Sequence, residues 1–251
     1  MASIDLNADL GETVDGVPTA DDEAMFAVVS SASVACGGHA GDAASMTDAV
    51  RRAMAQGVAV GAHPSFADRA GFGRVALAVA PAPLRDQVRE QIAALLRAGA
   101  DLRYVKPHGA LYHAVTTDPE TALAVADAVA DVSADLGRPV PLLGMPGEIA
   151  AVAASRGIPF FIEAFLDRGY LPSGGLVPRT EPGALLHDPD LVAERAVTLV
   201  REGRVDAVDG STIRVEAASL CLHGDTAGSV AMARAVRAAL DAAGIAVRAP
   251  W

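Results

Sequence analysis

Residues 33–62 read SVACGGHAGDAASMTDAVRRAMAQGVAVGA, and this stretch decides the fold. Residues 33–36 are small and apolar and end at a glycine-rich polar cluster, as a short buried strand does. An Ala-rich segment with helical spacing follows over residues 42–56, and Gly57 is placed to end that helix. A second apolar run, residues 58–62, follows directly. This order predicts a βαβ unit with two parallel strands.

The same unit repeats along the chain. We expect seven strands, over residues 3–7, 33–36, 58–62, 103–106, 140–144, 160–164 and 219–222. We expect helices over residues 21–30, 42–56, 83–98, 119–136, 147–155, 189–202 and 226–243. This alternation predicts a mostly parallel sheet, and seven repeats fit either a closed barrel or an open doubly wound sheet. No linker or shift in composition divides the chain, so we expect a single α/β domain over residues 1–251.

Three segments interrupt this alternation of strands and helices. Residues 63–79 and 168–187 are long loops rich in Gly and Pro, and loops of this length inside a compact domain are usually functional. Residues 205–208 and 212–216 are expected to form a β-hairpin around Asp209-Gly210.

The composition excludes several kinds of partner. The 251 residues carry 20 Lys and Arg against 31 Asp and Glu, and this net charge of −11 argues against nucleic acid and anionic membranes. The N-terminal residues lack the pattern of a signal peptide, and no apolar run approaches the ~18 residues of a membrane span. Two cysteines are too few for a secreted disulfide scaffold. We therefore expect a cytoplasmic protein.

The unusual polar residues fall where the predicted strands end. These clusters are residues 7–12 (NADLGE), 36–42 (CGGHAGD), 63–69 (HPSFADR), 106–109 (KPHG), 163–170 (EAFLDRGY) and 223–225 (HGD). The carboxyl ends of parallel strands lie on one face of an α/β fold, where ligands bind. Four of the six histidines belong to the clusters, namely His39, His63, His108 and His223. We therefore expect one shared functional site.

These residue types suit two kinds of chemistry. Asp9, His39 and His63 are the natural candidates for holding a divalent metal, although their spacing matches no metal-binding motif. Without a metal, His and Glu side chains can act as general base and acid for attack of water on an acyl group.

Basic side chains complete the expected site. Lys106 is the only lysine in the chain, and its compact ammonium is not interchangeable with a guanidinium. Lys106, Arg168 or Arg179 can hold a carboxylate or stabilise an oxyanion. The sequence has no GxSxG elbow, no phosphate-binding loop ending in Gly-Lys, and no GxGxxG fingerprint at its first helix. A serine nucleophile and a dinucleotide cofactor are therefore not expected.

Some of these residues also have simpler structural roles. Asp225 is placed to cap the helix that follows it. Asp68 and Arg69 can form a surface ion pair. His113 and His187 lie outside the strand-end clusters, and we expect both on the surface.

Six stretches together resemble a known family. They are residues 4–12 (IDLNADLGE), 35–42 (ACGGHAGD), 61–66 with 71–74 (GAHPSF and GFGR), 105–112 (VKPHGALY), 167–170 with 176–179 (DRGY and LVPR), and 221–225 (CLHGD). In this order they resemble the motifs of the LamB/YcsF family, the A subunits of bacterial ATP-dependent 5-oxoprolinase. The resemblance runs from the first strand to the last helix.

The resemblance implies a fold and a reaction. The implied fold is a distorted TIM-like barrel with seven parallel strands, similar to polysaccharide deacetylases. The implied reaction opens the lactam of 5-oxo-L-proline to L-glutamate and is driven by ATP hydrolysis. The A subunit is expected to work with separate B and C subunits. ATP is the expected cofactor, and whether its site lies on this chain, on a partner or is shared between them stays open. A bound divalent metal and a homo-oligomer both stay open.

The resemblance also implies site residues. The expected catalytic residues are Asp9, His39, His63, Lys106, His108, Glu163 and His223. The expected substrate-binding residues are Asn7, Glu12, Arg69, Asp167, Arg168, Arg179 and Asp225. His113 departs from the family, which usually has Asn after Ala-Leu-Tyr.

A mechanism follows from this set. We expect His63 or His108 to act as the base, because either imidazole can take a proton from water. Glu163 or Asp9 would orient that base. Lys106 and one of the two arginines named above would hold the carboxylate or a phosphate.

Two other functions are weighed beside this one. The first is a stand-alone metal-dependent deacetylase or amidohydrolase acting on a small amide. The second is a carrier protein that binds a small acid without chemistry. The density of His, Asp and Glu argues against a carrier, since binding a carboxylate needs mainly Arg and backbone donors.

Overall fold

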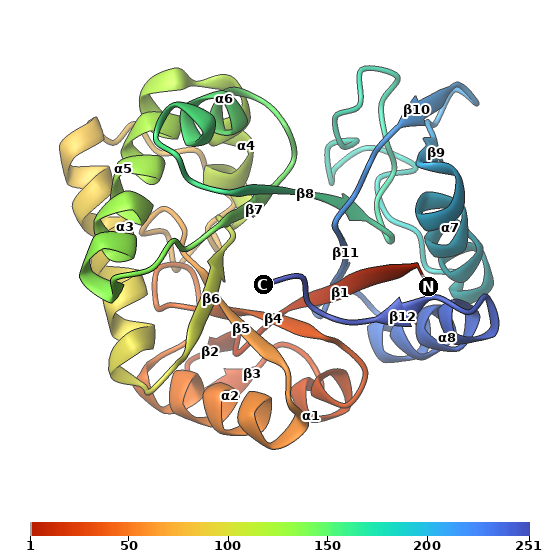
Figure 1. The fold of residues 1–251 in the computed structure, drawn as a ribbon, viewed down its shortest axis with the longest axis horizontal. Helices are drawn as coiled ribbons and strands as arrows, with labels where there is room; N and C mark the ends of the chain where they lie inside the picture. The colour runs from red at the N-terminus through yellow and green to blue at the C-terminus, as the bar shows by residue number, and fades with distance from the viewer. Residues whose placement is uncertain (1) are drawn as a thin grey trace.

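The computed structural model describes residues 2–251. Seven parallel strands lie side by side in chain order and close into a barrel, because the last strand pairs with the first (Figure 1). In order they are β1 (Ser3–Leu10), β4 (Ser31–Ala35), β5 (Ala59–His63), β6 (Leu102–Val105), β7 (Leu142–Gly144), β8 (Phe160–Phe165) and β11 (Ser219–His223). The closed barrel is confirmed, and the open doubly wound sheet is wrong.

Helices surround the barrel (Figure 1). They are α1 (Asp22–Phe26), α2 (Ala43–Gln56), α3 (Pro81–Arg97), α4 (Gly109–Thr117), α5 (Pro119–Leu136), α6 (Glu148–Ser155), α7 (Pro189–Glu202) and α8 (Ser229–Ala242). Within residues 2–251, no helix has the length and apolarity that a bilayer crossing needs.

Short strands complete the chain. Strands β9 (Arg204–Asp206) and β10 (Thr212–Arg214) pair in antiparallel fashion, which confirms the expected hairpin. A second hairpin joins β2 (Thr13–Val14) to β3 (Val17–Pro18). Strand β12 (Ala246–Val247) adds to β1 beside the barrel.

Three helices differ from the sequence expectation. Helix α1 ends at Phe26, whereas a helix over residues 21–30 was expected. Helix α4 was not expected, because residues 106–109 look like the start of a loop; its first residue, Gly109, adopts φ +54°. An alanine Cβ at Gly109 would lie 2.5 Å from the Gly73 carbonyl oxygen, so this position needs glycine. Helix α8 begins at Ser229, after Gly228 at its N-cap with φ +80°. Asp225 is therefore not a helix cap, and that expectation is wrong.

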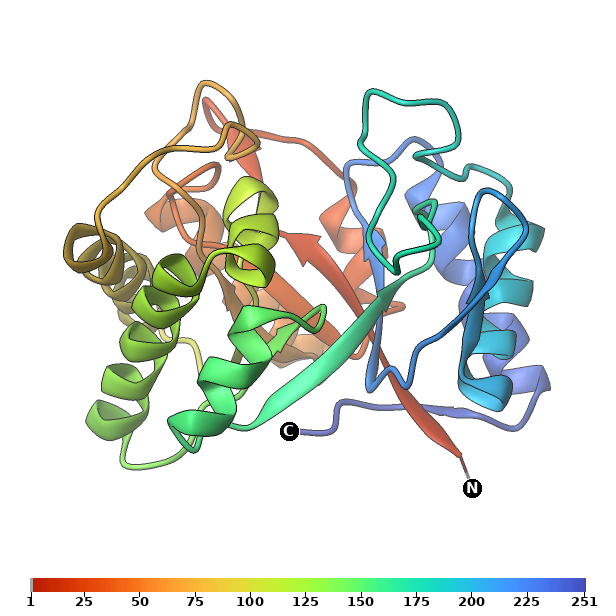
Figure 2. The same ribbon diagram turned by 90° about the horizontal axis from the view of Figure 1, so that it is seen from above.

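The long loops lie on the face where a site was expected. Figure 2 shows the loop after β5 and the loop after β8 on one side of the barrel, with both chain termini on the other. Because all seven barrel strands are parallel, their carboxyl ends share the face that bears these loops.

The end of the barrel near the termini is closed by aromatic rings and by a buried acid. The Trp251 ring lies 4.3 Å from that of Tyr104 and 5.5 Å from that of Phe161, measured between centroids. Asp5, which is 1% exposed, accepts hydrogen bonds from Ser31 and from two other serines. Burial raises the pKa of Asp5 despite these hydrogen bonds.

We predict that Gly61→Ala destabilises the protein while Gly144→Ala does not. A Cβ at Gly61 would lie 2.3 Å from the buried Tyr104 ring, whereas one at Gly144 would have its nearest neighbour at 3.7 Å. Overpacking of this kind costs about 1–3 kcal/mol. Urea unfolding at pH 7 measures both variants, and equal stability of the two would contradict this packing.

Candidate active site

A cavity of about 530 Å³ opens at the carboxyl ends of the strands. Half of the predicted site residues line it, namely Asp9, His63, Lys106, His108, Arg168, Arg179 and His223. They come from β1, β5 and β11 and from the loops that follow β6 and β8. The expectation that side chains distant in sequence meet on this face is thus met.

The buried ammonium of Lys106 holds the carboxylates of the site together. Lys106, 1% exposed, has its Nζ 2.8 Å from Oδ1 of Asp9, 3.0 Å from Oδ1 of Asn7 and 3.3 Å from Oε2 of Glu163. Its fourth neighbour is the Cys221 thiol, at 3.1 Å. Burial alone would lower the pKa of Lys106, but Asp9 and its other neighbours raise it well above the ordinary value. Lys106 is therefore a cation at neutral pH.

Asp9 is the carboxylate partner of this cation. Its Oδ2 also lies 3.4 Å from Nε2 of His63. Burial alone would raise the pKa of Asp9, but the charges of His63 and Lys106 hold it well below its usual range. Asp9 is thus an anion that faces the cavity.

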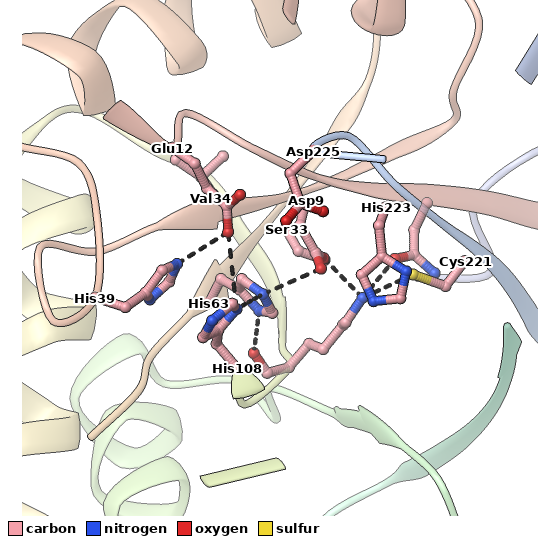
Figure 3. Close-up of polar contacts among 12 residues, drawn as sticks. Asp9, Glu12, Ser33, Val34, His39, His63, His108, Cys221, His223 and Asp225 are labelled. Atoms are coloured by element: carbon pink, nitrogen blue, oxygen red, sulfur yellow. Dashed lines mark hydrogen bonds and ion pairs between the residues drawn. The ribbon is translucent and has the colours of Figure 1, made fainter. Parts of the chain in front are cut away.

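Four buried side chains form what we call the histidine–glutamate cluster, shown in Figure 3: Glu12, His39, His63 and His108. Nε2 of His39 lies 3.0 Å from Oε1 of Glu12, and Nδ1 of His108 lies 3.0 Å from Nε2 of His63. The rings of His39 and His108 are stacked, with centroids 3.6 Å apart.

The cluster is shielded from solvent. Burial lowers the pKa of His39 and of His108, and the neighbouring histidines lower it further. Burial likewise raises the pKa of Glu12, and the charge of Asp9 adds to this effect. Burial therefore favours the neutral forms of Glu12, His39 and His108.

His223 forms a dyad with a buried carboxylate. Its Nδ1 lies 3.0 Å from both oxygens of Asp167, which also accepts a hydrogen bond from Thr226 at 3.0 Å. Burial alone would raise the pKa of Asp167, but His223 holds it below its usual range. The His223 ring stacks on Phe165 with centroids 5.3 Å apart and lines the cavity. The carboxylate fixes the orientation of the imidazole, as in catalytic dyads.

Three arginines line the cavity. Arg168 is 3% exposed and donates to the carbonyls of Ala184 and Val177, so it fastens the loop after β8. Arg179 comes from the same loop and is partly exposed. Arg74 pairs with Asp225 and was not predicted as a site residue, although it ends the GFGR stretch. A negatively charged ligand in the cavity would lie close to these arginines.

Several predicted residues support the site instead of lining the cavity. Asn7 donates to Ser219 at 2.8 Å and lies with Glu163 beside the Lys106 ammonium. Arg69 donates to the carbonyls of Gly37 and Gly41, at 2.9 and 2.8 Å.

One structural expectation needs correction. The expected Asp68–Arg69 ion pair is wrong, since Asp68 instead accepts from backbone amides within its own loop. His187 is exposed as expected, but the exposed His113 lies at the rim of the cavity. Tyr112 and Phe165 also line the cavity and were missed, because an aromatic residue in an apolar stretch gives no sign of facing a site.

The fold and site define a class: a parallel α/β barrel whose titratable side chains gather at the carboxyl ends of its strands, as in barrel enzymes. Comparison with known proteins is more specific. The chain matches the LamB/YcsF family over residues 4–250, and it belongs to that family.

Named relatives match the whole chain. It is 51% identical to the A subunit of 5-oxoprolinase from Streptomyces griseus, over 98% of this chain and 99% of the relative. It is 50% identical to the protein of the same name from Kocuria rhizophila, over 99% of both chains. Among solved structures, the "Lactam Utilization Protein" of Thermus thermophilus superposes with a TM-score of 0.91 at 44% identity, covering 98% of this chain and 99% of that one.

A more distant neighbour confirms the fold alone. A structure described as "T48 deacetylase with substrate" has a TM-score of 0.51 at 13% identity, over 98% of this chain and 87% of that one. The expected similarity to deacetylase barrels is thus confirmed.

We predict that Lys106→Met destabilises the protein by about 3–5 kcal/mol, because it leaves Asp9 and Glu163 buried without their cation. The double variant D9N/K106M should recover part of this loss, since it removes the pair instead of breaking it. Urea unfolding at pH 7 measures both.

The matched control is Arg97→Met, which breaks the exposed pair between Arg97 and Glu90, 62% and 71% exposed. It should change stability little, because exposed pairs contribute little. Lys106→Met as stable as the wild type would show that the ammonium does not hold the site together.

Proposed function

We propose that this chain is the A subunit of an ATP-dependent 5-oxoprolinase and that its cavity is where the lactam of 5-oxo-L-proline is opened to L-glutamate. Family membership and the names of full-length relatives support this assignment. The observation that carries it is one cavity lined by a buried ammonium, an oriented imidazole and arginines. This set suits a small anionic substrate that carries an amide.

The chemistry explains why ATP is needed. A γ-lactam is an unactivated amide, so its nitrogen leaves poorly and its carbonyl resists attack by water. Transfer of the γ-phosphoryl group to the amide oxygen activates the carbon. Water then adds to that carbon, the C–N bond breaks as the nitrogen takes up a proton, and the product is γ-glutamyl phosphate. A second water hydrolyses this acyl phosphate to glutamate and releases phosphate. The balanced reaction consumes 5-oxoproline, ATP and two water molecules and gives glutamate, ADP and phosphate.

Different residues around the cavity have different roles in this reaction. Arg179 and Arg74 are placed to bind the substrate carboxylate. Lys106 stabilises negative charge on the amide oxygen or on a phosphoryl group attached to it. His223, oriented by Asp167, delivers the proton to the leaving nitrogen.

A second group of residues activates the water that attacks the carbonyl carbon. His63, His108 and Asp9 line the cavity together and orient the attacking water. Without a bound metal an imidazole of this group takes the proton from water, and with the histidines bound to a cation the Asp9 carboxylate takes it. A divalent cation bound beside these residues would polarise water or the carbonyl oxygen.

We place ATP binding with the partner B and C subunits or at a surface shared with them. The only lysine of the chain follows Val105, so the sequence has no Gly-Lys phosphate loop. Because ATP is a cytoplasmic co-substrate, we assign the reaction to the cytoplasm.

A stand-alone metal-dependent amidohydrolase is the second candidate. The observation in its favour is the histidine–glutamate cluster, which could hold a metal without help from another chain.

Reconstitution separates the two functions. The chain is assayed alone and with the B and C subunits, with and without ATP, and glutamate formed from 5-oxoproline is measured. We expect glutamate only in the complete mixture with ATP. Hydrolysis of small amides by the chain alone, without ATP, would favour the second candidate. A complete mixture that binds ATP but forms no glutamate would contradict the proposal.

We predict that His223→Gln lowers kcat in the complete mixture by at least ~100-fold, since a positioned acid or base contributes about 10²–10⁴-fold. Asp167→Asn should lower kcat less and leave KM nearly unchanged, because it disturbs only the orientation of the imidazole. The control is His187→Gln, an exposed histidine away from the cavity, which should keep full activity. Normal turnover by His223→Gln would remove this residue from the mechanism.

A further inference from the structure

We propose that the histidine–glutamate cluster is a binding site for one divalent transition-metal ion, with Glu12, His39, His63 and His108 as its ligands. The inference concerns the site itself and holds whichever amide the protein hydrolyses.

The geometry of the donors is the first argument. One ligand atom from each of the four side chains lies within 4.8 Å of all the others, and all four residues are buried. Tetrahedral zinc with bonds of about 2.1 Å separates its ligand atoms by about 3.4 Å. The four donors can therefore surround one ion with small side-chain movements. They come from the ends of β1, β4, β5 and β6 and the segments that follow, so the barrel sets their spacing.

The tautomers of two histidines are the second argument. Nδ1 of His63 lies 2.7 Å from the backbone carbonyl oxygen of Lys106, so this nitrogen must carry a proton and donate. Nε2 of His108 lies 2.9 Å from the carbonyl oxygen of Phe72 and must donate as well. In the neutral rings, Nε2 of His63 and Nδ1 of His108 are then bare acceptors that face each other at 3.0 Å. A cation bound by both nitrogens removes the repulsion between their lone pairs.

These same carbonyl contacts are typical of metal sites. A metal-binding histidine usually donates its second N–H to a backbone carbonyl or a carboxylate, which fixes the ring and its tautomer. His63 and His108 both have this support before any ion is considered. His39 does not, since its Nδ1 has no hydrogen-bond partner among residues 2–251. Its position is set instead by stacking on His108.

Charge is the third argument. Within the described chain, the salt-bridge partners of Glu12 are only His39 and His108, while the Lys106 ammonium pairs with Asp9 and Glu163. Glu12 therefore has no Lys or Arg ion-pair partner among residues 2–251. A cation bound by the cluster would supply the missing partner of this carboxylate.

The donor set selects the metal. Three imidazole nitrogens and one carboxylate suit Zn²⁺, Co²⁺ or Ni²⁺, whereas Mg²⁺ and Ca²⁺ prefer oxygen ligands. The set differs from the expected trio of Asp9, His39 and His63. Asp9 belongs to the Lys106 pair, and Glu12 with His108 completes the cluster instead.

Direct binding to the full-length chain tests the site. The protein is stripped with chelator and dialysed, then titrated with Zn²⁺ by calorimetry and with Co²⁺ by visible absorption. We expect one equivalent to bind, with Co²⁺ bands of a low-coordinate nitrogen-ligated ion, and no competition from millimolar Mg²⁺. A folded wild-type chain that binds neither ion would overturn the proposal.

Variants identify the ligands. Glu12→Gln and His108→Gln should each weaken binding by at least ~100-fold, more than the 10–100-fold typical of losing a residue that only supports a ligand. Asp9→Asn should weaken it less than about tenfold, and His223→Gln should leave it unchanged. Circular dichroism and thermal melting confirm that each variant is folded. Unchanged binding by folded Glu12→Gln and His108→Gln, or an equal loss in His223→Gln, would show that the metal binds elsewhere.

Discussion

The buried ammonium of Lys106 is the interaction on which the rest of the structure depends. It extends from the end of β6 to Asn7 and Asp9 on β1, Glu163 on β8 and Cys221 on β11. An uncompensated charge in a protein interior is very costly, so these strands must keep the register that brings their acceptors to Nζ. The requirement that closes the barrel around Lys106 also positions Asp9 at the cavity. Stability and function therefore rest on the same side chains.

A glycine in the loop after β5 shows how the site is closed on its outer side. Gly73 has φ +65°, and a Cβ there would lie 2.8 Å from both His39 and His108. Only glycine lets this backbone lie directly against the His108 ring and the Cβ of His39. The same loop supplies the Phe72 carbonyl that His108 contacts and the Arg74 guanidinium at the cavity. A loop that looked irregular in sequence is therefore part of the site, and the arginines beside it suit an anionic amide as substrate.

Much of the fold could be predicted because local signals were strong. Short apolar runs ending in Gly, His and Asp marked the seven strands, and the parallel arrangement placed their polar ends on one face. The choice between barrel and open sheet could not be made from periodicity, since it depends on whether β11 meets β1. Within the site, sequence could not group Glu12 with His39, because that contact depends on a turn after β1. Arg74 and Tyr112 were missed for the same reason: their orientation depends on how loops fold over the barrel. Helix α4 was missed because its Gly and Pro neighbours hid its start.

The position of the lactam is the most direct test of the central claim, that this cavity is where the amide is opened. A crystal structure of the chain with 5-oxo-L-proline measures it. We predict the ring in the cavity, with its carbonyl oxygen near Lys106 Nζ, its nitrogen near His223 and its carboxylate near Arg74 or Arg179. A lactam bound only in another cavity, such as the one lined by Arg195 and Asp206 between α7 and β9, would contradict the claim.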